Sequence, residues 1–443
     1  MLRSLYEPIL RLSGLLPDSN QASVRIDALQ PSIIHDENQL RINLYNVIKN
    51  GVLKLEPCQL SQNFVQWTHL SDNRSASYAW ISLAQLKVPA DLMRTVAHDV
   101  ALKIAYEPLP QNTDRSLQVE REVYERVTNH LLMNGNTPHV TFYYGTLACD
   151  TFVQQLKQNA ATNEDAKRLL HNMHKHYRWR SMPKNYNLDH MRAMVLEKNA
   201  GRTLEAFLRQ DVSGDKLADF EVLLPIFFQI IYTLAAFRDV GLQHNDLHTQ
   251  NVFVGKKETA ARSVYQVTKD SAYALDTIYD VRIFDFDRAY KASTATSSFE
   301  INNVHLREEL CTTFGVCEKQ DSRLELFRLF HFCNKHSSSN KALREFLEFC
   351  VPADLLDLVG DDEPYDLPAV GSACLCNAAN GCDTCDIIND VRIKLPREIL
   401  ASHYFERYRL PQTSSLPLES AAAVTPGSEN IVWRLPTLAV DEN

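Results

Sequence analysis

The sequence predicts an α+β fold in two parts, because strand patterns dominate the first part of the chain and helix patterns the second. Two strand-like segments, Phe64–Leu70 and Tyr78–Leu86, flank a polar turn and therefore predict a hairpin. Asp99–Leu109 predicts a third strand. A long apolar helix pattern over Leu217–Val240 then opens a part that is mostly helical to about Leu410. Strands followed by helices are typical of the α+β class.

The segments between these elements complete the two parts. Ser116–Met133 carries charge on one face and apolar residues on another at helical spacing, which predicts a helix. His139–Cys149 and the start of Met191–Leu208 predict two more strands, the second leading through a linker into a helix. Residues 150–190 form a polar interruption that is helical at first and basic towards its end. Nearer the N-terminus, Leu40–Ile48 predicts a strand preceded by a turn.

These patterns predict four regions along the chain. They are an N-terminal extension (1–63), a strand-rich lobe that includes the basic insertion (64–196), a helical lobe (197–410) and a flexible tail (411–443). The tail is rich in Ser, Ala and Pro, a composition that is typical of disordered segments or of segments draped over a surface.

The bulk composition excludes some classes of protein. Hydrophobic residues make up 45% and charged residues 23% of the 443, which is enough to bury a sizeable core. The formal net charge of -9 gives no global attraction to nucleic acid or to an anionic membrane. The most apolar run, Leu223–Phe237, is shorter than the roughly 20 residues that span a bilayer. It contains Pro225, Gln229 and Thr233, so it predicts a buried helix and no membrane span.

The N-terminal segment and the cysteines bear on the compartment. Met1–Pro17 has Arg3, Glu7 and Arg11 among its leucines, so it lacks the apolar core of a secretory signal. We therefore expect an intracellular, cytoplasmic protein in a reducing compartment. A mitochondrial address is the minor alternative, and Glu7 argues against it.

The segment HNDLHTQN carries the strongest chemical signal in the sequence. It contains His244 and places Asn251 five residues after Asp246, directly before the apolar segment Val252–Val254. The carboxylate of Asp246 can orient an attacking hydroxyl or accept its proton, and the amide oxygen of Asn251 can bind a metal ion. A polar turn before a strand is the plain alternative, but this combination is rare by chance. The motif therefore predicts phosphoryl transfer, which needs both groups.

A second acidic motif, IFDFD, ends the apolar segment that follows. Asp285 comes where this strand ends, a position suited to a Mg²⁺ ligand. Asp287 is either a second ligand or a solvated acid, and the pattern favours the solvated acid.

A lysine and a glutamate upstream complete the set of charged groups. Lys103 lies on a predicted strand and shares a face with Ala101 and Ala105, whose small side chains leave room for a nucleotide. Glu120, on the next predicted helix, is placed to fix such a lysine, and Glu122 is the competitor on another face. The plain alternatives are a solvated lysine on an edge strand and an ordinary charged helix face.

This set of motifs resembles the signature of the protein kinase superfamily, which has a lysine on its third strand, an H-R-D-x-x-x-x-N loop and a D-F-G segment. The residues of the motifs HNDLHTQNVFV and FDFD are similar to those of the divergent serine/threonine protein kinases of large cytoplasmic DNA viruses, and also to those of haspin-like kinases. The resemblance covers about residues 64–408, and Pro396–Tyr408 resembles the closing helix of a kinase C-lobe. It implies a two-lobed protein-kinase-like fold with a β-rich N-lobe and a helical C-lobe.

The resemblance also implies cofactors, a substrate and residue roles. ATP and Mg²⁺ would be the cofactors, and a protein serine or threonine would be the substrate. Lys103 would grip the α- and β-phosphates and pair with Glu120, and Asp246 would be the catalytic base. Mg²⁺ would be held by Asn251 and Asp285. The other implied residues are Leu196, Glu197 and Asn199, which would line the adenine-binding hinge, and Asp321, which would brace the catalytic loop.

One departure from the family lies in the turn between the first two strands. The chain has only 13 glycines, and this turn, Leu70–Tyr78, contains none. Ser71, Asn73 and Ala76 stand where the family has the glycines of its phosphate-binding loop. Backbone N–H groups there can still approach phosphate, but the side chains add bulk.

Further departures surround the acidic motifs. Asn245 replaces the arginine that recognises a phosphorylated activation loop, which predicts that such phosphorylation does not control the protein. His248 stands where protein kinases usually carry a lysine or arginine near the γ-phosphate, and Asp287 replaces the glycine of D-F-G. No A-P-E motif follows, and Tyr290–Leu310 is an unusual activation region.

Two further segments suggest binding. Four cysteines within a dozen residues can close a tetrahedral zinc site of structural type, and a reducing compartment favours metal over disulfide. These are Cys374, Cys376, Cys382 and Cys385. Reduced surface thiols are the alternative. The basic stretch His174–Lys184 mixes cations with aromatic residues, so it predicts contact with nucleic acid or an acidic protein, against a solvated helix end as the alternative.

Three functions therefore compete. The first is an active serine/threonine protein kinase in the host cytoplasm or a virion, as the resemblance to viral kinases implies. The second is a small-molecule kinase of the aminoglycoside or choline phosphotransferase type, to which His248 is also suited. The third is a catalytically inactive scaffold, which the missing glycines favour. The intact set of Lys103, Asp246, Asn251 and Asp285 favours an enzyme, because a scaffold has no chemical need for all four.

Overall fold

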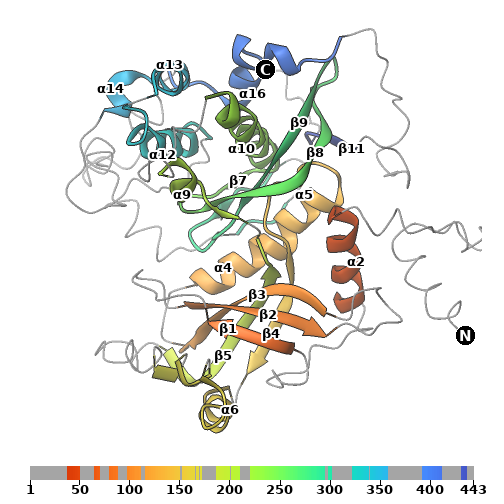
Figure 1. Cartoon of the computed structure of the whole chain (residues 1–443), viewed down its shortest axis with the longest axis vertical. Helices are drawn as coiled ribbons and strands as arrows, with labels where there is room; N and C mark the ends of the chain where they lie inside the picture. The colour runs from red at the N-terminus through yellow and green to blue at the C-terminus, as the bar shows by residue number, and fades with distance from the viewer. Residues whose placement is uncertain are drawn as a thin grey trace, which may run out of the picture. The chain divides into compact units, whose positions relative to one another are not determined.

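The computed structural model of the chain is a mixed α+β structure, as the order of strand and helix patterns predicted (Figure 1). It describes residues 37–49, 64–69, 79–87, 97–110, 115–149, 152–164, 166–168, 170–171, 186–199, 201–209, 220–294, 298–301, 322–338, 340–357, 392–411 and 431–436. The chain forms two compact units. Unit 1 comprises Met1–Thr113 and Phe142–Lys198, and unit 2 comprises Asp114–Thr141 and Asn199–Asn443.

Unit 1 is built on a five-stranded antiparallel sheet in the order β1-β2-β3-β5-β4. The strands are β1 (Phe64–His69), β2 (Ala79–Lys87), β3 (Ala97–Pro108), β4 (Tyr143–Cys149) and β5 (Tyr186–Glu197). The predicted hairpin, the third strand and the two later strands are thus confirmed. The central strand β3 buries Leu102 and Ile104 on one face and Lys103 on the other, as period-2 alternation requires.

The N-terminal extension contains a helix where a strand was predicted. Residues 37–49 form α2 (Glu37–Lys49), which packs on β4 in unit 1. The prediction was wrong because Arg41, Leu44, Tyr45 and Ile48 repeat at helical spacing, and the first three are buried on one side. The Tyr45 ring meets Phe142 edge-on at 5.5 Å between centroids.

Within the predicted insertion, α6 (Phe152–Asn159) also belongs to unit 1, which agrees with a helical start to that segment. The helix predicted over Ser116–Met133 is present as α4 (Ser116–Val123), a π-helical turn (Tyr124–Thr128) and α5 (Asn129–Met133). This helix groups with unit 2 and not with the strand-rich unit. The reason is packing, since the Tyr124 ring contacts Phe286 of unit 2 at 5.3 Å.

The core of unit 2 is α10 (Phe220–Val240), whose apolar residues are buried almost all round. Among the described residues, this is the one helix with the length and hydropathy to cross a membrane, and 83% of the apolar window is buried inside the structure. Such burial is typical of a core helix. Gln229, in its middle, donates to the Pro225 and Tyr279 carbonyls at 3.1 Å, so this buried amide is hydrogen-bonded.

A long antiparallel hairpin packs on α10 and consists of β8 (Val252–Thr268) and β9 (Ser271–Ile283). The sequence had predicted only a short strand at each end, with a polar stretch between them, and that interpretation was wrong. The middle is strand because Tyr265, Val267 and Tyr273 are buried while polar residues alternate with them.

Short strands extend this sheet and a smaller one. β6 (Arg202–Thr203) pairs with the first part of β8, and β7 (Leu242–Gln243) pairs with β10 (Tyr290–Lys291). In the predicted flexible tail, β11 (Ile431–Arg434) pairs in parallel with β8. That part of the tail is therefore ordered in a sheet, and it buries Trp433.

Helices complete unit 2, as predicted for the region that ends near Leu410. They are α9 (Leu204–Leu208), α12 (Ser322–Asn334), α13 (Lys341–Cys350), α14 (Ala353–Leu356), α16 (Pro396–Leu400) and the 3-10 turn His403–Tyr408. Phe346 on α13 packs against Phe227, Phe330 and Tyr404 with ring centroids 5.0 to 5.9 Å apart. Aromatic contacts of this kind hold α12, α13 and the last turn against α10.

Candidate functional site

Two loops of unit 2 meet at one end of the β8–β9 hairpin. The first loop, His244–Asn251, enters β8, and the second, Phe284–Ala289, leaves β9. Because the strands are antiparallel and Val252 pairs with Ile283, the two loops start side by side. The backbone N–H of Phe284 donates to the Asn251 carbonyl at 3.2 Å. The hairpin thus brings the two acidic motifs together, although the whole of β8 and most of β9 separate them along the sequence.

Within the first loop, side chains are held by the backbone of the same loop. The Asn251 amide nitrogen donates to the Asp246 carbonyl at 2.9 Å. Since that contact requires the N–H₂ group, the amide oxygen of Asn251 points away from it and can accept from a donor or bind a cation. The loop therefore fixes the side chain of Asn251 against the backbone of Asp246.

His244 ties the first loop to the second. Its Nε2 atom lies 2.9 Å from the Phe284 carbonyl, and its Nδ1 atom accepts from the backbone N–H of Asp246 at 3.3 Å. A carbonyl only accepts, so Nε2 carries the proton and the imidazole is neutral. Burial of the ring also lowers the pKa of His244. The residue is a structural link between the two loops.

Asn245 and Asp285, one in each loop, adopt left-handed backbone conformations, with φ of 65° and 69°. Asn and Asp tolerate this region better than most residues, and such conformations cluster at functional sites. Contacts hold both in place. The Asn245 side-chain amide donates to the Arg288 carbonyl at 3.1 Å, and the Asp285 N–H donates to the Tyr124 hydroxyl at 3.1 Å.

Phe286 anchors the second loop in the core. Its ring packs against Tyr124, Phe237 and His244 with centroids 5.3, 5.8 and 4.7 Å apart. Since Phe286 is fully buried, the aspartates on either side of it, Asp285 and Asp287, are carried on a fixed backbone.

Helix α12 supports the first loop through two buried charged residues. The Glu325 carboxylate accepts from the Asn245 N–H at 2.8 Å, and the Arg328 guanidinium donates to the carbonyl of the same residue. Burial raises the pKa of Glu325 to about 7, and the positive charge of Arg328 opposes that rise. Sequence reasoning missed both residues. The signal was two charges three positions apart within the otherwise apolar run Leu324–Phe330. Asp321, the residue expected to brace the loop, lies outside the described residues.

The carboxylate of Asp246 has charged and polar groups on both sides. Arg288 Nη1 lies 3.2 Å from its Oδ1 atom, and His248 Nε2 lies 4.0 Å from its Oδ2 atom. Desolvation lowers the pKa of His248. Its Nδ1 atom accepts from the backbone N–H of Gln250 at 3.2 Å, so the proton of the neutral ring sits on Nε2.

A second carboxylate near this loop is engaged in structure. Glu205, on α9, accepts from the Thr249 hydroxyl at 2.5 Å and lies 3.4 Å from His336 Nε2. Burial by itself raises the pKa of Glu205, but the hydrogen bonds from His336 and Thr249 outweigh it and lower the pKa to about 2. This carboxylate stays ionised at neutral pH and ties the loop to α9.

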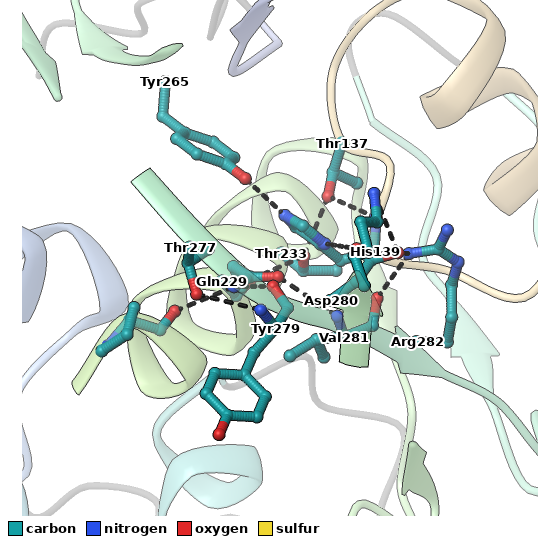
Figure 2. A network of polar contacts seen from close by, with 12 residues as sticks. Thr137, His139, Gln229, Thr233, Tyr265, Thr277, Tyr279, Asp280, Val281 and Arg282 are labelled. Atoms are coloured by element: carbon teal, nitrogen blue, oxygen red, sulfur yellow. Dashed lines mark hydrogen bonds and ion pairs between the residues drawn. The ribbon is translucent and has the colours of Figure 1, made fainter. Parts of the chain in front are cut away.

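A buried polar network holds the last residues of β9, directly before the second loop (Figure 2). The imidazole of His139 lies between the Tyr265 hydroxyl, 2.9 Å from Nε2, and the Asp280 carboxylate, 3.5 Å from Nδ1. Asp280 also pairs with Arg282 at 2.5 Å. Burial would raise the pKa of Asp280, but Arg282 and His139 outweigh it and hold the pKa well below its usual range.

The same network reaches the strand that carries Asp285. The backbone of Ile283 exchanges hydrogen bonds of 3.0 Å with the His139 carbonyl and the Thr141 N–H. On the other side, Gln229 of α10 accepts from the Val281 N–H at 3.1 Å (Figure 2). The position of Asp285 is thus fixed from two sides before the loop begins.

The remaining predicted residues are divided between the units. In unit 1, Lys103 pairs in the sheet with Ile81 and Met194, and its side chain is buried. In unit 2, Glu120 is 1% exposed, whereas Glu122 is partly exposed and accepts from Gln118 at 2.8 Å. The pairing of Lys103 with Glu120 stays a prediction.

The predicted hinge residues have definite side-chain partners. Glu197 is buried, pairs with Arg41 of α2 at 2.7 Å and accepts from the Phe142 N–H at 3.1 Å. Its carboxylate is therefore engaged inside unit 1. Leu196 is buried in the sheet, and the Asn199 amide of unit 2 donates to the Thr141 hydroxyl at 2.9 Å. Their contact with adenine stays a prediction.

Several predictions lie outside the described residues. These are the phosphate-loop positions Ser71, Asn73 and Ala76, the cysteines Cys374, Cys376, Cys382 and Cys385, and the basic stretch His174–Lys184. Within the described ranges, no group of three or more His, Cys, Asp or Glu side chains could hold a metal ion. Binding of Mg²⁺ by Asn251 and Asp285 stays a prediction. Their amide and carboxylate oxygens are ligands of the type that this ion takes, with phosphates and water completing its shell.

Neither the protein-family models nor the curated proteins compared with this chain give a match.

Proposed function

We propose that this chain is an ATP-dependent phosphotransferase of the protein-kinase type, which transfers the γ-phosphate of Mg-ATP to a serine or threonine hydroxyl of a protein. The observation that carries the proposal is the meeting of two loops at one end of the β8–β9 hairpin. It brings Asp246 and Asn251 next to the strand end that carries Asp285, and these are the groups that phosphoryl transfer requires.

In the proposed reaction, the acceptor hydroxyl oxygen forms a bond to the γ-phosphorus of ATP. The bond from that phosphorus to the β,γ-bridging oxygen breaks, and its electron pair leaves on ADP. The hydroxyl proton passes to the carboxylate of Asp246, which acts as general base. Asn251 and Asp285 would hold Mg²⁺, which when bound neutralises charge on the phosphate oxygens.

The buried charges in each unit support this assignment. Lys103 and Glu120 are both nearly inaccessible, and lysine and glutamate side chains are almost never buried unless they are paired. Lys103 would grip the phosphates of ATP. The left-handed conformations of Asn245 and Asp285 also favour an enzyme over a scaffold, because strained backbone is typical of sites that do chemistry.

The experiment that tests the proposal measures transfer of labelled γ-phosphate in the presence of Mg²⁺. Purified protein is compared with Asp246→Asn, which keeps the shape of the side chain and removes its basicity. Asp276→Asn is the matched control, since Asp276 is an exposed acid on β9 of the same unit. Casein-like proteins and a panel of aminoglycosides and choline serve as acceptors.

We expect label on protein serine or threonine from the parent and from Asp276→Asn, and loss of label in Asp246→Asn. Label on a small molecule would replace the protein substrate by the small-molecule alternative. Absence of both transfer and ATP binding in the parent would overturn the proposal in favour of a scaffold.

A further inference from the structure

Arg288 lies on the carboxylate that the proposed reaction uses as its base. Its Nη1 atom donates to Asp246 Oδ1 at 3.2 Å, and the side chains are 40% and 23% exposed. The backbone of Arg288 is fixed, because its carbonyl accepts from the Asn245 side-chain amide and the next N–H, that of Ala289, donates to the Phe286 carbonyl at 3.1 Å. The guanidinium is thus carried on a fixed backbone and contacts Asp246.

Among the described residues, two other basic side chains lie near Asp246, and neither offers an exposed positive charge. His248 faces the second carboxylate oxygen, but its Nδ1 accepts from a backbone N–H, so the ring is neutral. Arg328 lies within electrostatic range of Asp246, but it is buried and bonded to the Asn245 carbonyl. Within the part of the chain that the structure describes, Arg288 is therefore the cation that both contacts Asp246 and is exposed to solvent.

An arginine at this place is suited to a phosphate. The guanidinium presents several N–H donors in one plane, which match two phosphate oxygens at once, and charge-assisted pairs of this kind are strong. The existing pair with Asp246 is partly exposed, so it is weak by comparison. A phosphoryl group that enters the site next to Asp246 would therefore compete well for Arg288.

We propose that Arg288 is a catalytic residue that exchanges its contact with Asp246 for one with the transferred phosphoryl group. Before the donor binds, Arg288 covers the Oδ1 atom of the base. When the γ-phosphate enters, Arg288 turns to it, stabilises its charge during transfer, and leaves Oδ1 open to the acceptor hydroxyl. Binding of the phosphate donor thereby exposes the Oδ1 atom of Asp246. Arg288 supplies the positive charge next to the γ-phosphate, which His248 cannot supply because its ring is neutral. This inference rests on the proposed function.

The test compares Arg288→Gln and Arg288→Lys with the parent under Mg-ATP, measuring kcat and the KM values for ATP and acceptor. Arg262→Gln, an exposed arginine on β8, is the matched control. If Arg288 acts on the phosphoryl group in transfer, Arg288→Gln lowers kcat by about 100-fold and changes the acceptor KM little. Arg288→Lys recovers part of kcat, because it restores the charge without the planar fork. Thermal unfolding checks that all variants fold as the parent does.

Other outcomes separate this inference from the proposed function. If Arg288→Gln keeps or raises kcat while Asp246→Asn is inactive, Arg288 only covers the base, and the exchange is overturned while the kinase function stands. If Arg288→Gln and Arg288→Lys lose kcat equally and also melt early, the role is structural and the exchange is again overturned. If the parent itself transfers phosphate to nothing, the proposed function fails, and the exchange fails with it.

Discussion

The Glu325 carboxylate accepts a hydrogen bond of 2.8 Å from the backbone N–H of Asn245, a residue 80 positions earlier in the chain. Arg328 donates to the carbonyl of the same residue. Helix α12 thus holds both backbone groups of a residue whose φ is positive, directly before Asp246. The pair stabilises the shape of the loop, and it does so with buried groups whose ionisation depends on pH.

The first prediction concerns that pH dependence. Burial raises the pKa of Glu325 from 4.5 to about 7, so between these values the folded state keeps a proton that the unfolded chain has lost. The contribution to the free energy of unfolding is therefore full below about 4.5 and is lost as the pH rises through about 7, by about 3 kcal/mol at most. Glu325→Gln keeps an acceptor for Asn245 and cannot ionise.

Urea denaturation at pH 5, 6.5 and 8 measures this difference. We expect the parent to lose more stability than Glu325→Gln over the interval. Asp239, whose pKa burial raises to about 6, is present in both proteins and gives both a shared slope. Identical pH profiles would show that Glu325 does not titrate in this range.

The second prediction separates the two aspartates beside Phe286. Asp285→Asn keeps a side chain that tolerates the positive φ but removes a charge from the proposed metal site. We expect a loss of about 100-fold or more in kcat and a higher Mg²⁺ requirement, with unchanged thermal unfolding. Asp287→Asn is the matched variant, and we expect it to stay within a few-fold of the parent. Equal losses in both would make Asp287 a ligand too.

The third prediction concerns Phe299, in the segment after the second loop. The guanidinium carbon of Arg126 lies 3.9 Å from the centre of its ring, and the ammonium of Lys291 lies 4.8 Å away. Each such contact contributes about 0.5–2 kcal/mol. Both contacts attach the ring of Phe299 to cations without a phosphate group.

We therefore expect phosphatase treatment to leave activity unchanged. Phe299→Leu should lower the thermal midpoint and the activity, and Phe299→Trp should retain both, because the negative ring face and not the apolar volume attracts the cations. A loss of activity after phosphatase treatment would contradict this and would indicate control by a phosphorylated residue.

The fourth prediction concerns the C-terminal strand. β11 pairs with β8 and buries Trp433, and the Arg434 N–H donates to the Gly135 carbonyl at 2.8 Å. Trp433→Ala should lower the free energy of unfolding by about 3–5 kcal/mol, and Trp433→Phe by much less. Chemical denaturation measures both. A loss below about 1 kcal/mol in Trp433→Ala would show that the strand adds little to unit 2.

Local patterns predicted most of the elements. Period-2 alternation gave the strands of unit 1, and helical spacing gave α10 and the helix that begins at Ser116. The failures are also physical. In α2 a charged residue, Arg41, lies on the buried side of the helix and interrupts its apolar stripe. Its partner Glu197 lies 156 positions away, so nothing nearby in the sequence indicates that Arg41 is buried. The stretch of β8 before Tyr265 looks polar because residues 258–262 are exposed one after another, so neither face of the strand is apolar there.

The candidate site divides in the same way. Asp246, Asn251 and Asp285 could be chosen from sequence because their chemistry and spacing are local. Arg288 and Glu325 could not, because nothing in their neighbours shows that they contact the loop from other elements. Contacts between distant segments, such as these, are fixed by tertiary packing.

Because β8 and β9 form an antiparallel hairpin, the two motifs stay side by side however many residues separate them along the sequence. Val252 pairs with Ile283 whatever the length of the arms beyond them, so residues can be added in matched pairs near the turn at Lys269 and Asp270 without moving either motif. A search for relatives of this chain should therefore leave the gap between HxDxxxxN and DFD open. The same turn is a suitable place to attach a fluorophore or an affinity tag, because it lies at the far end of the strands from Asp246 and Asp285.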